Sequence, residues 1–114
     1  MKQPKHYIGE FEELVLLAIL SLREQAYGMK IGDAIEEATG RSVSVGALYT
    51  TLSRLEEKGL ITSWMGEATA ERGGRAKKYF KIEARAKLAL HHAEASRKRL
   101  ANLKPTVNLT GVIR

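Results

Sequence analysis

Residues 44–61 read SVGALYTTLSRLEEKGLI, and this stretch decides the fold of the chain. Its leucines recur at intervals of four and three residues, which predicts an amphipathic helix whose buried face carries Leu48, Leu52 and Leu55. Ser44 fits the N-cap position because a serine hydroxyl accepts a hydrogen bond from an amide of the first helical turn. Gly59, followed by an apolar residue, is typical of a helix that ends in the left-handed conformation.

The hydrophobic period of the sequence changes at Gly59. Before it, two further segments have helical periodicity, and Gly40 is placed to end the second. After it, two short segments alternate with period two on either side of a polar loop, and a long helical segment follows. Three helices, a hairpin and a final helix are the order of a winged helix-turn-helix, a mainly α (α+β) fold whose hairpin is the wing. We expect helices over residues 10–22, 27–39, 44–59 and 84–103, and strands over 60–65 and 78–83.

The composition indicates one small folded domain. The chain has 114 residues, of which 44% are hydrophobic and 28% charged. It has no cysteine, which excludes disulfides and thiolate metal sites. Its longest apolar run, over residues 14–20, is too short to cross a bilayer, and residues 1–7 are not followed by the apolar segment of a signal peptide. We therefore expect a cytoplasmic protein with no membrane association.

Charge is distributed unevenly along the chain. Residues 1–71 contain seven Lys/Arg and eleven Asp/Glu, a net charge of −4, whereas residues 72–114 contain twelve and two, a net charge of +10. Part of the surface is therefore expected to attract polyanions. Nucleic acid is the favoured partner, and an acidic membrane surface is the competing one.

The free face of the 44–59 helix carries small and polar side chains. In a helix-turn-helix the second helix lies in the major groove, with its N-terminal residues nearest the bases. Arg54 could hold a guanine or a phosphate with two parallel hydrogen bonds, and hydroxyls suit either. The alternative interpretation is an ordinary solvated face. The predicted DNA contacts of this helix are Ser44, Gly46, Tyr49, Thr50, Ser53 and Arg54.

The loop of the hairpin is strongly cationic. Within seven positions it places two glycines and four cations, namely Arg72, Arg75, Lys77 and Lys78. A flexible basic hairpin tip can follow a DNA backbone or enter a minor groove, although many charge runs are only solvated. On a wing beside the helix described above, these four residues are predicted to bind double-stranded DNA.

Four blocks of the chain, EELVLLAILSL, AYGMKIGDAIEEATG, SVGALYTTLSRLEEKGLITS and GGRAKKYFKIEARAK, resemble the PadR family of bacterial transcriptional regulators. The resemblance covers about residues 9–103. It implies a winged-helix homodimer that binds operator DNA, usually as a repressor, with the last helix forming the dimer. It also implies that Tyr49 lies near DNA, as do Arg75, Lys77 and Lys78 of the wing.

Three positions depart from the family pattern. Thr50 and Ala76 stand where the family usually or often has proline, and residues 83–87 lack its Thr-x-x-Gly turn. The terminal helix resembles that of the small subgroup with one such helix. It carries a seam of small and apolar residues at steps of four and three. The first helix has surplus apolar surface, so we expect dimerisation through Leu16, Leu20, Ala89, Ala93, Leu100 and Leu103, although the last helix could pack on its own domain.

These features predict three parts of the chain: a winged-helix DNA-binding domain over residues 1–83, a dimerisation helix over 84–104 and an unassigned tail over 105–114. We expect neither an enzyme nor a metal or cofactor, because the adjacent His91 and His92 point about 100° apart on a helix and the acids lie on outward faces. A small-molecule effector has no support among the residues. The alternative function is a winged-helix module that binds an acidic protein partner.

Overall fold

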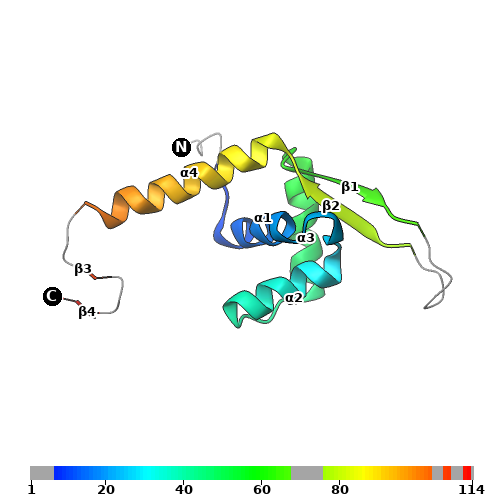
Figure 1. Cartoon of the computed structure of the whole chain (residues 1–114), viewed down its shortest axis with the longest axis horizontal. Coiled ribbons are helices and arrows are strands. Elements are labelled where there is room, and N and C mark those ends of the chain that lie inside the picture. Colours follow the sequence, from blue (N-terminus) through cyan, green and yellow to red (C-terminus); the bar gives the residue numbers. More distant parts are fainter. Residues whose placement is uncertain (1–6, 68–75, 104–106, 109–111, 114) are drawn as a thin grey trace.

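The computed structural model describes residues 7–67, 76–103, 107–108 and 112–113. It confirms the predicted winged helix-turn-helix, with a two-stranded antiparallel wing beside the helices (Figure 1). The 3-10 turn was not predicted, and the last helix ends two residues before the predicted end. The elements are α1 (Glu10–Leu22), η1 (Arg23–Gln25), α2 (Gly28–Thr39), α3 (Val45–Glu57), β1 (Ile61–Met65), β2 (Lys78–Ile82), α4 (Ala84–Ala101), β3 (Val107–Asn108) and β4 (Val112–Ile113).

The helix ends lie where the local signals predicted them. The Ser44 hydroxyl accepts a hydrogen bond from the Ala47 amide at 3.1 Å. Gly40 and Gly59 adopt φ values of 74° and 76°, which favour glycine because a β-carbon is strained there. The Leu60 amide then donates to the Leu55 carbonyl at 3.0 Å, which closes the end of α3.

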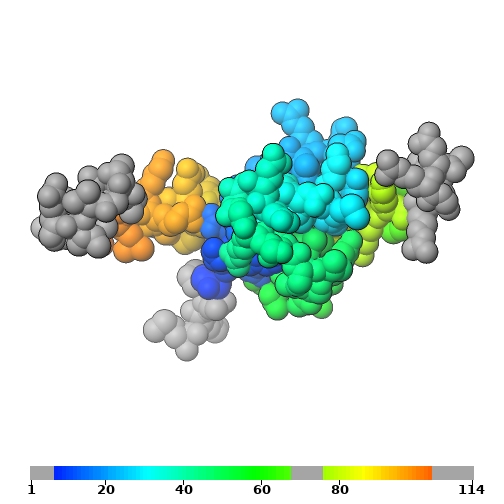
Figure 2. Space-filling model, turned by 90° about the horizontal axis from the view of Figure 1, so that it is seen from below, coloured from blue at the N-terminus to red at the C-terminus, as the bar shows by residue number. Residues whose placement is uncertain are grey.

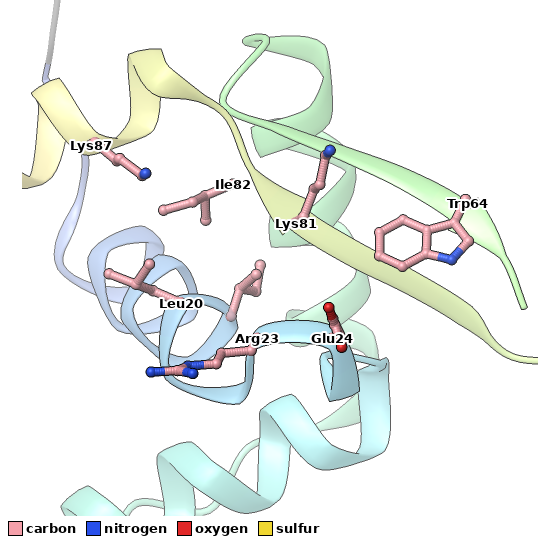
Figure 3. Close-up of a pocket in the computed structure, with 8 residues that line it drawn as sticks. Leu20, Arg23, Glu24, Trp64, Lys81, Ile82 and Lys87 are labelled. Atoms are coloured by element: carbon pink, nitrogen blue, oxygen red, sulfur yellow. The ribbon is translucent and has the colours of Figure 1, made fainter.

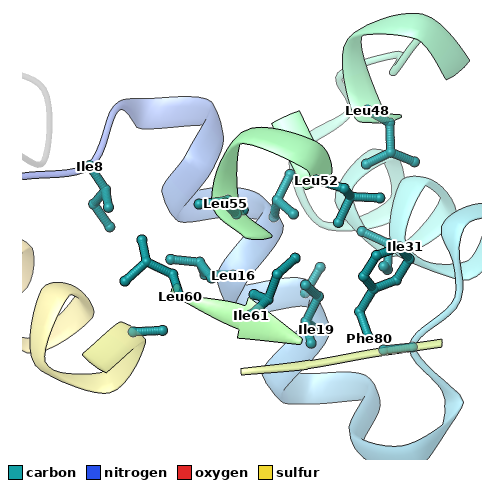
Figure 4. Close-up of a cluster of buried hydrophobic side chains, with 14 of the residues drawn as sticks. Ile8, Leu16, Ile19, Ile31, Leu48, Leu52, Leu55, Leu60, Ile61 and Phe80 are labelled. Atoms are coloured by element: carbon teal, nitrogen blue, oxygen red, sulfur yellow. The ribbon is translucent and has the colours of Figure 1, made fainter. Parts of the chain in front are cut away.

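The core lies where α1, α2, α3 and the wing meet (Figure 4). Its largest fully buried side chains come from all four, among them Leu16, Ile19, Ile31, Leu52, Leu55, Ile61 and Phe80. Leu16, which was expected at a dimer interface, has 0% exposure inside this core. Its side chain therefore has no surface to offer a second copy of the chain.

Only the beginning of α4 is buried. Ala86 and Ala89 have 0% and 1% exposure against the domain, so the predicted seam starts inside the protomer and Ala89 is not available to a partner. The C-terminal end of α4 extends away from the other helices (Figure 1), and Leu100 and Leu103 are 69% and 68% exposed. The second half of the helix therefore presents apolar side chains to solvent.

The wing has a third, very short pairing partner. β1 pairs with β2 so that Trp64 lies opposite Tyr79, and Tyr27 forms an isolated antiparallel bridge on the other side of Tyr79. The Phe80 amide donates to the Ala26 carbonyl at 2.8 Å. The wing is thus joined to the residues that precede α2, a connection that the hydrophobic pattern did not predict. In the tail, β3 and β4 pair with each other.

Candidate nucleic-acid interface

The two faces of α3 are divided as predicted. Leu48, Leu52 and Leu55 are buried, and Thr51 is buried with them. The other face is exposed and carries all six predicted contact residues of this helix and its cap: Ser44, Gly46, Tyr49, Thr50, Ser53 and Arg54. Nothing within 4 Å would meet a β-carbon at Gly46, so this position is open at the surface. The face therefore has the small, polar character that an approach to a DNA groove requires.

The side chain of Tyr49 is less free than its position on α3 suggests. Its ring lies over Gly28, the first residue of α2, and its hydroxyl lies where a β-carbon of residue 28 would be. It remains 43% exposed. Tyr49 therefore combines a packing contact with a surface position.

Two exposed apolar residues lie at the N-terminal ends of the helix-turn-helix. Met29 in the first turn of α2 and Val45 in the first turn of α3 are each 72% exposed. Apolar side chains at such positions can contact thymine methyl groups. The sequence analysis missed them because it considered polar, charged and small residues as contacts. In the sequence, each is an apolar residue within two positions of a predicted helix start.

The described part of the wing holds its cations over aromatic rings. Lys77 Nζ lies 4.4 Å from the centroid of the Tyr27 ring, and Lys78 Nζ lies 5.8 Å from that of Phe80. Both lysines are exposed, whereas the predicted contacts Arg72 and Arg75 lie outside the described residues. Cation–π contacts of this kind orient an ammonium group and leave part of it open to an anion.

An aromatic row crosses the wing, and Lys77 lies over the Tyr27 ring at one end of it. Tyr79 stacks on Trp64, with ring centroids 5.7 Å apart and an angle of 19°. On its other side it meets Tyr27 edge-on, at 5.5 Å and 72°. Offset stacking and edge contacts are favoured arrangements of aromatic pairs, so the row stiffens the base of the wing.

The wing and α3 pack directly on one another. The Ser63 hydroxyl of β1 donates to Glu56 Oε2 of α3 at 2.7 Å, and the neighbouring Phe80 is buried in the core. In the view from below, α2 and α3 form the surface toward the viewer, with the described part of the wing on one side and α4 on the opposite side (Figure 2). The cationic hairpin and the exposed helix face therefore belong to one packed unit.

The C-terminal end of α3 is anchored by a carboxylate on α1. Lys58 Nζ donates to both oxygens of Glu12 at 3.0 and 2.9 Å, and the Gly9 amide donates to Glu12 Oε1 at 2.8 Å. Burial by itself would raise the pKa of Glu12, but the Gly9 hydrogen bond and the Lys58 ammonium outweigh it and hold this pKa below its usual value. Glu12 is therefore an ionised structural group that positions α3.

A hollow of about 240 Å³ lies between α1, η1, the wing and the start of α4 (Figure 3). Its floor is mainly apolar, and three exposed cations stand around it. The positive charge of the domain therefore extends from the wing toward α4. The lining residues are Ile19, Leu20, Arg23, Glu24, Trp64, Lys81, Ile82 and Lys87.

Neither a cluster of metal-ligating side chains nor a membrane-spanning helix occurs in the part of the chain that the structure describes. In that part, no group of three or more His, Cys, Asp or Glu side chains is placed to hold a metal ion. The helices of that same part are each too short or too polar to span a membrane.

The sequence of this helix-turn-helix and wing matches a known protein family. Residues 16–92, which include the helix-turn-helix and the wing, match the transcriptional regulator PadR-like family. The chain belongs to the PadR-like family. This confirms the resemblance that the four sequence blocks indicated, and with it the assignment of a DNA-binding transcriptional regulator.

Solved PadR-like structures share the fold of this PadR-like protein. A PadR-like transcription factor from Bacteroides fragilis is 28% identical, with a TM-score of 0.63 over 79% of this chain and 82% of that one. A PadR family regulator from Eggerthella lenta is 27% identical, with a TM-score of 0.63 over 82% and 80% of the two chains. One from Clostridium difficile is 25% identical, with a TM-score of 0.61 over 81% and 95%. A search of curated proteins found no match.

Proposed function

We propose that this PadR-like protein is a repressor that binds, as a homodimer, to an operator with dyad symmetry. The observation that carries the proposal is that the cationic wing packs against α3. The leucine face of α3 is buried, and the face with its predicted DNA contacts is exposed. A duplex laid along α3 would meet the wing cations in the same approach. Residues 1–83 would bind DNA in this arrangement, and residues 84–104 would hold the dimer.

The two parts of this surface are suited to different tasks. Cations such as Lys77 and Lys78 attract phosphates without regard to sequence, and so supply affinity that falls with salt. The exposed face of α3 offers the hydroxyls of Thr50 and Ser53 and the guanidinium of Arg54 to base edges. We therefore assign affinity mainly to the wing and sequence preference mainly to α3.

A homodimer is supported by apolar surface that the protomer leaves exposed. Leu20 of α1 is 45% exposed. Leu100 and Leu103, near the end of α4, are 69% and 68% exposed. Because Leu16 and Ala89 are buried in the protomer, the proposed interface is formed by exposed or half-buried apolar residues of α1, of α4 and just after α4: Leu17, Leu20, Ala93, Leu100 and Leu103. Two copies related by a twofold axis would place their α3 helices in major grooves roughly 34–36 Å apart.

We favour repression because the PadR resemblance implies it. A dimer bound to an operator at a promoter would block access to that promoter. The deciding experiment compares binding of the full chain to the duplex upstream of its own gene with binding to a scrambled duplex, at physiological salt. We expect the upstream duplex to bind at least about 10³-fold more tightly, as specific sites do. Equal binding to both would contradict the proposal and would favour an acidic protein as the partner.

A further inference from the structure

The contact between Tyr49 and Gly28 can exist only because residue 28 is a glycine. A β-carbon built on Gly28 would lie 2.6 Å from Cζ of Tyr49 and 3.2 Å from its Cε2, with the hydroxyl still nearer. Carbon atoms do not approach so closely, so any larger residue would displace the ring. Gly28 is buried and helical, so its requirement is for space and not for a left-handed backbone.

The residue before Gly28 makes the contact with the wing. Tyr27 pairs with Tyr79 of β2 through the isolated bridge and through the ring contact at 5.5 Å. Its ring also lies under the ammonium of Lys77, at 4.4 Å. Two consecutive residues therefore touch the two parts of the proposed DNA surface, the wing through Tyr27 and α3 through Gly28.

We propose that Tyr27, Gly28 and Tyr49 form a joint that sets the angle between the wing and α3, and that Tyr49 acts in it as a positioning residue. The sequence analysis placed Tyr49 among the DNA contacts, and its seat on Gly28 adds this second role. The proposal rests on the proposed function, because the angle matters only if the wing and α3 engage one duplex together.

The joint is expected to matter for specific binding more than for general affinity. Phosphate contacts by flexible lysines tolerate a change in the direction of the wing, because their attraction depends weakly on geometry. Hydrogen bonds to base edges lose most of their strength when they are misaligned. Loosening the joint should therefore lower the preference for the operator and leave binding to scrambled DNA nearly unchanged.

The first test uses Gly28→Ala with a matched control on the same helix. The new β-carbon should displace Tyr49 and lower the operator-to-scrambled affinity ratio by about tenfold or more, the size of one lost base contact. Gly32→Ala makes the same chemical change, but its β-carbon would meet Leu48 Cδ2 at an ordinary 3.6 Å. It should leave the ratio unchanged. Equal effects of the two substitutions would overturn the proposal.

A double variant separates the joint from a loss of stability. In a Tyr49→Ala background the space above residue 28 is empty, so Gly28→Ala should cause no further loss of the ratio. Tyr49→Phe, which keeps the ring and removes only the hydroxyl, covers the case in which Gly28→Ala fails to fold. It should lower the ratio less than Tyr49→Ala does. A loss from Gly28→Ala of the same size in both backgrounds would refute the contact as its cause.

A second readout requires no DNA. The chain has no cysteine, so cysteines introduced at the exposed positions Glu57 of α3 and Glu67 of the wing can carry a pair of spin labels. Labelled chains diluted with unlabelled protein should give a narrow distance distribution, broadened by Gly28→Ala and Tyr49→Ala but not by Gly32→Ala. An unchanged distribution in Gly28→Ala would overturn the joint even if the operator is bound. Conversely, a wild-type protein without operator preference would refute the proposed function, and the label distances would still decide the joint.

Discussion

Arg97 Nη2 lies 2.7 Å from Glu13 Oε2, so an ion pair joins the outer half of α4 to the first turn of α1. The Glu13 side chain is 15% exposed and that of Arg97 is 59% exposed. The hydrogen bond with Glu13 and the charge of its carboxylate raise the pKa of Arg97 above its usual value, so Arg97 remains positively charged. Arg97 lies one turn before the exposed Leu100 of α4, so we expect the pair to hold this part of the helix in place.

Arg97→Gln is expected to weaken the proposed dimer more than it destabilises the fold. Because the Arg97 side chain is largely exposed to solvent, loss of the pair should lower the free energy of unfolding only slightly. The freed outer half of α4 should raise the dimer dissociation constant, measured by sedimentation. Lys98→Gln is the control, since the ion pair of Lys98, at 3.9 Å, is with Glu94 of the same helix. The same dissociation constant for both variants would argue against a directing role.

If the proposed dimer forms, Leu100→Asp is expected to convert it into a folded monomer. A charge at the centre of an apolar interface opposes association, whereas a side chain that is 69% exposed in the protomer contributes little to its core. Light scattering should show the change of mass, and circular dichroism should show unchanged helix content. Met29→Asp, an equivalent change at an exposed site on α2, should remain dimeric. A dimeric Leu100→Asp variant would place the interface elsewhere.

Lys77→Ala is expected to weaken binding to operator and scrambled duplexes alike. Removal of one phosphate contact should reduce the slope of log K against log salt by about one. The measurement is a salt titration of both duplexes, with Lys87→Ala at the start of α4 as a control of equal charge. Arg75, outside the described residues, is expected to behave as Lys77 does. An unchanged salt slope for Lys77→Ala would indicate that the wing does not contact the DNA phosphates.

Thr50→Ala and Arg54→Ala are expected to change which operator is preferred. A contact to a base edge favours one base pair over the others by about 1–3 kcal/mol, so its removal should relax preference at one position of the site. Selection from a randomised duplex library would reveal that position. A uniform loss of affinity across all sequences would instead identify these residues as phosphate contacts.

Glu12→Gln is expected to destabilise the protein at neutral pH. Because the folded-state pKa of Glu12 is lowered, its ionised form stabilises the fold above the usual carboxyl pKa, and this contribution is lost as the pH falls through the folded-state value. At pH 7 the substitution should lower the free energy of unfolding by about 1–3 kcal/mol, and the difference from wild type should shrink in acid. Denaturant titrations across pH test this. Glu10→Gln, which removes the exposed pair with Arg41, should have a much smaller effect.

Most of the fold could be predicted because its signals are local. Gly40 and Gly59 end helices through their own backbone conformation, and Ser44 caps α3 through an amide three residues away. The division of α3 into a buried and an exposed face likewise follows from leucine spacing along one helix. The 3-10 turn η1 escaped prediction because three residues are too short to show a period.

The arrangement of the candidate site was harder to predict from the sequence. The predicted contacts on α3 are exposed as expected, but the seat of Tyr49 on Gly28 joins residues of two helices. The apolar spacing of α1 and α4 did not reveal that Leu16 and Ala89 would be used by the protomer itself. Periodicity identifies the side chains that need cover and does not say which surface provides it.

The sequence by itself therefore determined the four helices and the two wing strands, their order, the family and the cationic character of the wing, because these depend on neighbours along the chain. Only the tertiary structure decided that Tyr27 meets Tyr79, that Gly28 receives Tyr49, and that Arg97 reaches Glu13. Those contacts depend on how finished helices and strands pack in three dimensions, where the shape of each side chain selects its partner from residues distant in sequence.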